Sequence, residues 1–185
     1  MIGAIGVTLY MFSGSHSVLM AELMLRHKGI PYRRVNVLPG VHVPVLRFKR
    51  FPNTTVPAME VDGRRIQGTL EISRELDRLV AEPRLFPLDP GLRAKVEAAE
   101  RWGEDLQNES RRVLYCMARR DVRGFTSFIT PGRARPTRWF LRATAAGLVK
   151  VAGSVHGASE AAGRTGVAAL PGRIDQIDAW IAEGV

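Results

Sequence analysis

Cysteine is nearly absent from the sequence, since Cys116 is the only one among 185 residues. A single cysteine excludes an intramolecular disulfide, so we expect a reducing, cytoplasmic setting. Long apolar runs are absent as well, and none approaches the roughly 18 residues that a membrane-spanning helix needs. The paired cysteine and histidine spacings of zinc sites are missing too, so the sequence predicts no metal centre.

Acidic side chains are scarce between residues 111 and 150. Ten lysines and arginines stand there against one acid, Asp121, in a chain whose formal net charge is +9. Such a stretch suits nucleic acid, an anionic membrane or an anionic small molecule, and it also suits a plain solvated face. No aromatic RNA-binding motif, zinc spacing or helix-turn-helix pattern accompanies it, so we predict no specific nucleic-acid partner.

The N-terminal residues predict a strand, a helix and a second strand. Residues 7–12 are a short apolar run of the kind found in buried strands, and turn-forming serines and glycine follow it. Residues 18–28 have helical composition and end before Gly29, which can stop a helix. Residues 32–37 alternate apolar and basic side chains, as a strand does. A β-α-β unit of this kind usually folds as a right-handed parallel crossover.

A hairpin and a helix complete the predicted first domain. After a short irregular helix at 45–51, residues 59–67 carry an Asp-Gly pair at 62–63 between strand-forming residues. This pair favours a two-residue type I′ turn, because both of its positions need positive φ. Thr69 is expected to cap a helix over residues 70–80. The predicted order is therefore β-α-β-α-β-β-α.

The second half of the sequence predicts helices and no strand. Residues 81–90 contain several prolines and are expected to form a linker, whose Asp89 precedes a proline suited to the first helical position. Residues 153–172 are rich in glycine and alanine, and we expect a mobile loop or lid there. The fold class is therefore α/β plus all-α, with an α/β domain over 1–80 and a helical domain over 91–185.

The dipeptide Val56-Pro57 precedes the predicted hairpin. Proline cannot donate to a β-ladder, so it occurs at strand starts, at edges or at bulges. A cis bond would turn the preceding backbone outward and offer the N–H and C=O of Val56 to a ligand. The position after a β-α-β unit and before a hairpin and a helix predicts the cis form, and a trans bond at a strand start is the alternative.

Taken in order, several of these segments resemble the glutathione S-transferase family. The resemblance is carried by Leu9-Tyr10, Ser15, and the segments 28–32, 55–58, 62–63 and 69–72. The stretch 89–112, which includes residues 100–104, resembles the start of the helical domain of bacterial members. It implies a thioredoxin-like first domain, followed by a shortened helical domain like the C-terminal domain of the family, and a cytoplasmic homodimer. It also implies a transferase that conjugates glutathione, or a similar low-molecular-weight thiol, to an apolar electrophile held by the helical domain. The thiol would be a co-substrate, with no permanently bound cofactor.

The resemblance implies a catalytic position near the first helix. Ser15 matches the hydroxyl that activates the thiol in serine-type members, and a hydroxyl at a helix N-terminus can donate to a thiolate that the helix dipole also favours. The rival catalytic residue is Tyr10. A further alternative is that Ser13, Ser15 or Ser17 only caps the helix. His16 is a candidate for contact with the bound thiol, or a plain turn residue.

The resemblance also implies a thiol-binding edge. Val56, beside Pro57, would pair its backbone with the cysteinyl part of the thiol. Where members hold the γ-glutamyl group with an acid or glutamine followed by serine, this sequence has Gly68 and Thr69. The Thr69 hydroxyl and the helix N-terminus can still bind a carboxylate, and Gln67 compensates for the missing side chain if it points into the same pocket. This departure leaves the identity of the thiol open, with a non-catalytic binding or assembly module of the same fold as the alternative function.

Overall fold

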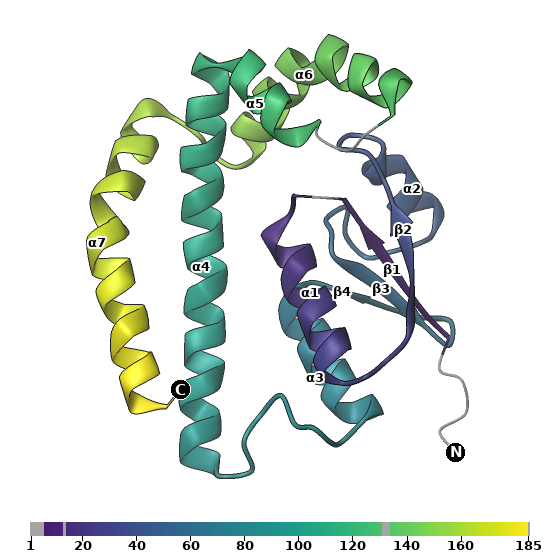
Figure 1. The fold of residues 1–185 in the computed structure, drawn as a ribbon, viewed down its shortest axis with the longest axis vertical. Helices are drawn as coiled ribbons and strands as arrows, with labels where there is room; N and C mark the ends of the chain where they lie inside the picture. The colour runs from purple at the N-terminus through teal and green to yellow at the C-terminus, as the bar shows by residue number, and fades with distance from the viewer. Residues whose placement is uncertain (1–5, 13, 131–133, 185) are drawn as a thin grey trace. The chain divides into compact units, whose positions relative to one another are not determined.

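The protein consists of two compact units, residues 1–88 and 89–185. The structure, a computed structural model, describes residues 6–12, 14–130 and 134–184. The first unit is α/β and the second is built of helices, which confirms the predicted fold class (Figure 1). Among the described residues, no helix combines the length and the apolar character needed to cross a membrane.

The first unit is a four-stranded sheet with three helices, in the predicted order β-α-β-α-β-β-α. The strand order in the sheet is β2-β1-β3-β4; β1 runs parallel to β2, and β3 runs antiparallel to both of its neighbours. The strands are β1 (Val7–Met11), β2 (Tyr32–Asn36), β3 (Ala58–Val61) and β4 (Arg64–Gln67). The helices are α1 (His16–His27), α2 (His42–Phe48) and α3 (Thr69–Leu79).

The predicted hairpin turn joins β3 to β4. Asp62 has a φ of 47° and Gly63 a φ of 79°. Positive φ at both central positions is what a type I′ turn requires. The two-residue turn fixes the pairing of β3 with β4 and therefore the place where β4 ends.

The sheet is covered on both faces. On one face, the Tyr10 ring lies 5.3 Å from that of Phe51, and the Phe12 ring lies 5.6 Å from that of His42 in α2. Helices α1 and α3 pack together against the other face (Figure 1). The fully buried large side chains of this core include Leu9, Leu25, Leu46, Met59, Ile72 and Leu76.

A buried ion pair joins α1 to α3. The Lys28 side chain is 0% exposed, forms an ion pair with Asp77 and donates a 2.8 Å hydrogen bond to the carbonyl of Val80. The Asp77 carboxylate also accepts from the backbone N–H of Leu85, at 2.8 Å, and of Phe86, at 3.2 Å. Burial alone would raise the pKa of Asp77, but the hydrogen bonds from Lys28 and the two N–H groups lower it below its usual value.

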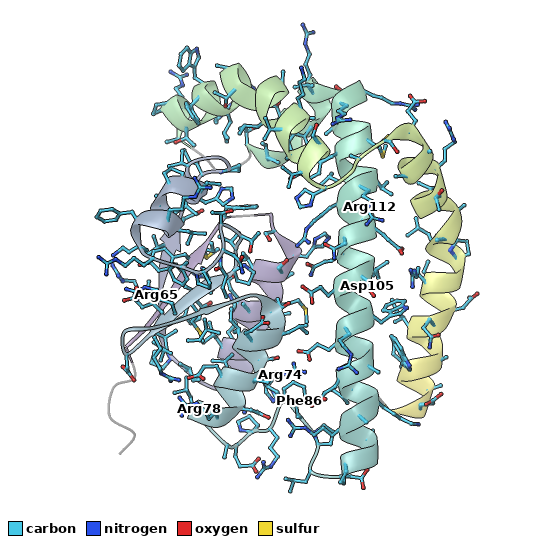
Figure 2. The ribbon with its side chains drawn as sticks, turned by 180° about the vertical axis from the view of Figure 1, so that it is seen from behind. Arg65, Arg74, Arg78, Phe86, Asp105 and Arg112 are labelled. Atoms are coloured by element: carbon cyan, nitrogen blue, oxygen red, sulfur yellow. The ribbon has the colours of Figure 1, made fainter. Side chains whose placement is uncertain are left out.

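The segment before residue 89, expected to be a linker, packs on the first unit. The ring of Phe86 is only 3% exposed, and the Arg74 guanidinium lies over it at 4.6 Å (Figure 2). The Glu82-Pro83 bond is cis, a feature that the sequence did not reveal. The first unit therefore extends to Leu88.

The second unit contains four helices among its described residues: α4 (Pro90–Arg120), α5 (Val122–Ile129), α6 (Arg135–Val155) and α7 (Glu160–Glu183). As predicted, Asp89 caps α4 and accepts from the N–H of Leu92 at 2.7 Å. Helices α4 and α7 run side by side in opposite directions (Figure 1). Between them, the rings of Trp102 and Trp180 meet edge to face at 4.9 Å.

The prediction of a mobile loop or lid at residues 153–172 is wrong, because most of this stretch is helical. Three of its glycines, Gly153, Gly163 and Gly166, lie close to side chains of α4. A Cβ added at Gly163 would lie 2.9 Å from the Sγ of Cys116, and one at Gly166 would lie 2.6 Å from Cγ2 of Val113. The absence of a side chain at these positions allows α7 to approach α4 closely.

Candidate functional site

Three chain segments meet at one end of the sheet in the first unit. Ala58 at the start of β3 pairs with Tyr10 near the end of β1 and with Gln67 at the end of β4. The loop before β3 and the N-termini of α1 and α3 therefore lie at the same end of the sheet. This arrangement gathers most of the residues that the sequence singled out.

The Val56-Pro57 bond is cis, as predicted. Pro57 is fully buried, and its carbonyl accepts a 3.1 Å hydrogen bond from the N–H of Gly68. That bond ties the start of β3 to the start of α3. Among the described residues, none forms a hydrogen bond with the backbone N–H or C=O of Val56. Val56 as a whole is 8% exposed, and the described part of the chain leaves its backbone groups unengaged.

Gln67 does not compensate for the missing side chain at position 68. It is 8% exposed, and its Oε1 accepts from the N–H of Asn53 at 2.7 Å. Its Nε2 donates to the carbonyls of Asn53, at 3.0 Å, and Thr55, at 2.5 Å. Both amide protons are therefore used inside the protein. Gln67 therefore holds the loop that precedes Val56. This structural role replaces the predicted contact with the thiol.

Helix α3 is capped by Gly68, and the prediction that Thr69 is the N-cap is wrong. Gly68 has a φ of 97° and a ψ of 153°, and Thr69 is the first helical residue. The positive φ is a conformation that glycine adopts without the strain that a Cβ would bring. The Thr69 side chain is partly exposed at the helix N-terminus, whose first N–H groups can bind an anion.

A carboxylate that the sequence did not point to lies beside the N-terminus of α3. A Cβ added at Gly68 would lie 2.5 Å from Oε2 of Glu71. Glu71 is the third residue of α3, from which a side chain can reach back to the N-cap. The space next to position 68 is therefore occupied by an acidic group, although that position has no side chain. A glutamate three residues after the cap is the signal that would have revealed it.

Ser15 is the N-cap residue of α1, with a φ of −88° and a ψ of 122°. Its hydroxyl makes no capping hydrogen bond, so the alternative of a helix-capping side chain does not apply to it. His16 is the first residue of the helix and is exposed, whereas Ser17 is buried. Ser13 lies outside the described residues. The Ser15 hydroxyl is thus partly exposed at a positive helix end.

Tyr10, the rival catalytic residue, is part of the core. It is 2% exposed, and its hydroxyl donates to Oε2 of Glu60 at 3.3 Å. The ring packs against Phe51 on the α2 face of the sheet. The structure therefore gives Tyr10 a packing role.

The family comparison covers this unit. The model described as "Glutathione S-transferase, N-terminal domain" matches residues 9–84. This part of the chain is therefore similar to the N-terminal domain of the glutathione S-transferases. The matched residues include the Val56 edge, both helix N-termini and the Lys28–Asp77 ion pair.

Solved glutathione S-transferases share the fold. One from Rhodospirillum rubrum F11 has a TM-score of 0.54 at 21% identity, over 72% of this chain and 59% of its own. Another, from Methylobacterium radiotolerans and in complex with glutathione sulfonate, has a TM-score of 0.51 at 19% identity, over 78% of this chain and 64% of its own. The chain thus spans less than two thirds of the length of either structure. No curated protein matches the chain.

Proposed function

We propose that this protein is a glutathione S-transferase that binds glutathione, or a similar γ-glutamyl thiol, and conjugates its sulfur to an apolar electrophile. The observation that carries the proposal is the grouping at one end of the sheet. An unpaired backbone edge at Val56, a helix start with the Glu71 carboxylate, and the Ser15 hydroxyl all belong to segments that meet there.

The Val56 edge suits the peptide part of the thiol. An extended peptide can pair its backbone with an exposed N–H and C=O, as an added strand does. Gln67 supports this edge, because its three hydrogen bonds hold the loop at Asn53 and Thr55. The cysteinyl residue of the thiol would pair with Val56.

The α3 start suits an α-amino acid group, which carries both charges. The first N–H groups of the helix and the Thr69 hydroxyl would bind the carboxylate. The Glu71 carboxylate would accept from the ammonium group. This pairing supports a γ-glutamyl group even though Gly68 lacks the side chain that the family resemblance implies.

The Ser15 hydroxyl would donate to the sulfur. A hydroxyl donor and the positive end of α1 both favour the thiolate, which lowers the pKa of the bound thiol from about 8.5. The thiol proton leaves to solvent, and the thiolate forms a carbon–sulfur bond with the electrophile. The leaving group departs with the electrons of the broken bond.

Replacement of the hydroxyl tests this role. We expect Ser15→Ala to slow conjugation of glutathione to an aryl halide about 10-fold or more, because less of the bound thiol is ionised at neutral pH. Ser15→Thr retains the hydroxyl and should restore most of the rate. Ultraviolet titration of bound glutathione should show a higher thiol pKa in Ser15→Ala only. An unchanged rate and an unchanged titration would remove Ser15 from the mechanism.

The carboxylate is tested by Glu71→Gln. Loss of a charge-assisted hydrogen bond should weaken glutathione binding at least about 10-fold by calorimetry. An analogue of glutathione without the α-amino group should bind the variant and the original protein equally. Equal loss for both ligands would show that Glu71 does not meet the ammonium group.

A non-catalytic binding or assembly module is the second candidate, and the bare Gly68 position favours it. Measurable binding of glutathione without turnover of any aryl halide or epoxide would support this candidate.

A further inference from the structure

The loop between α2 and β3 depends on one side chain for the hydrogen bonds of its middle part. The backbone fixes the two ends of this loop, at Phe51 and at Pro57. In the described part of the chain, residues 52–56 make no backbone–backbone hydrogen bond. The Gln67 side chain instead takes part in three hydrogen bonds with the backbone of this middle part. The conformation of the loop just before Val56 is therefore set by Gln67.

One of these hydrogen bonds orients the N–H of Val56. The Nε2 of Gln67 donates to the carbonyl of Thr55 at 2.5 Å. That carbonyl and the N–H of Val56 belong to the same planar peptide group, and in a trans group the two point in opposite directions. The Thr55–Val56 bond is trans. Gln67 therefore keeps the N–H of Val56 pointing away from its own amide.

The N–H of Val56 has no partner although the residue is nearly buried. Val56 is 8% exposed, and no described residue accepts a hydrogen bond from its N–H. Backbone groups in such surroundings are almost always hydrogen-bonded in folded proteins. An acceptor from outside the chain, such as the carbonyl of a bound ligand, would complete this N–H.

We propose that Gln67 is the positioning residue that directs the N–H of Val56 to the cysteinyl carbonyl of the bound thiol. This inference rests on the proposed function and narrows its substrate class. The site selects thiols that carry a carbonyl group beside the cysteinyl Cα, as peptide thiols do. Gln67 touches no substrate atom and acts only through the peptide group of Thr55 and Val56.

Two ligands that differ by this carbonyl group test the proposal. Both γ-glutamylcysteinamide and γ-glutamylcysteamine have the γ-glutamyl group and the thiol, and only the first has the carboxamide beside the cysteinyl Cα. The original protein should bind γ-glutamylcysteinamide about 10-fold more tightly by calorimetry, because one further hydrogen bond forms.

Replacement of Gln67 should remove this preference. Gln67→Met has a side chain of similar length that cannot donate. It should weaken binding of γ-glutamylcysteinamide about 10-fold and change that of γ-glutamylcysteamine less than about 2-fold. A role in folding alone would weaken both ligands equally.

Two further variants serve as controls. Gln67→Glu keeps the acceptor for the N–H of Asn53 but, when ionised, has no donor for the carbonyls, so it should behave like Gln67→Met. Ser73→Ala removes a hydroxyl that is 1% exposed and donates to the carbonyl of Leu70 inside α3. This substitution should lower the stability of the first unit and leave both affinities unchanged. Circular dichroism checks that each variant is folded.

The outcomes separate this inference from the proposed function. If the original protein binds neither of the two ligands nor glutathione, the proposed function fails and the inference fails with it. If it binds the two ligands equally well, or if Gln67→Met weakens both to the same degree, the proposed function stands and the role of Gln67 is overturned. The comparison of ligands needs no variant, so it decides the outcome even where a substitution prevents folding.

Discussion

The two units bury their side chains differently. The first unit holds a continuous core of large residues from its sheet and from α1, α2 and α3. In the described part of the second unit, Leu141 and Val149 are the only buried apolar side chains larger than alanine. Along α7, moreover, five aliphatic side chains are 38% to 68% exposed: Val167, Leu170, Ile174, Ile177 and Ile181.

The two units therefore gain their stability from different interactions. The first unit gains from the removal of large apolar surface from water. The second relies more on close helix approach at Gly163 and Gly166, where small residues let side chains of α4 fill the space. Substitutions should therefore act on the two units through different mechanisms.

The largest effect is expected from the buried lysine of the first unit. Lys28→Ala leaves Asp77 without its cation, and breaking a buried pair costs about 3–5 kcal/mol of unfolding free energy. Hydrogen exchange of the full chain should show the loss mainly in residues of the first unit. Arg26→Ala, at an exposed position of the same helix, is the control. A loss below about 1 kcal/mol, or an equal loss in both units, would show that the two units do not differ in this way.

A smaller effect is expected from the helix contact of the second unit. Gly166→Ala would place a Cβ 2.6 Å from the β-branched Val113 and should destabilise that unit by about 1–3 kcal/mol. Gly147→Ala, in the interior of α6, meets no atom within 4 Å and should stabilise by up to about 1 kcal/mol. Denaturant unfolding gives both values. The same sign for the two substitutions would show that close approach is not what Gly166 provides.

The smallest effect is a difference in pH dependence. The folded state lowers the pKa of Asp77, so its contribution to stability is present above the unfolded value of about 3.9 and is lost as the pH falls through the folded value. Asp77→Asn should therefore flatten the acid-induced loss of stability between about pH 5 and pH 2. Glu160→Gln, which alters an exposed pair in the second unit, should leave that loss unchanged. The denaturation midpoint against pH checks both variants.

The sequence predicted the elements whose signals are local. The Asp62-Gly63 pair specifies its own turn, and Asp89 before Pro90 specifies a helix start. The Val56-Pro57 isomer also followed from its neighbours. These features depend on residues next to one another, which a sequence shows directly.

The errors arose where the deciding contact lies far along the chain. Gly163 suggested a loop, but it is a helical residue that faces Cys116. Gln67 was assigned to the thiol, but its partners are the backbone groups of Asn53 and Thr55. The direction of a side chain at a strand end, and the helix that a glycine faces, depend on tertiary packing.

The lone cysteine acquires a use from its place in the α4–α7 pair. The Sγ of Cys116 points to the surface of Gly163, and no other thiol competes with it for a reagent. Cys116 is also partly exposed, so a spectroscopic label can be attached at one defined place, beside the point where α7 approaches α4. The chain therefore offers a single-site probe of the spacing between these two helices without any engineered cysteine.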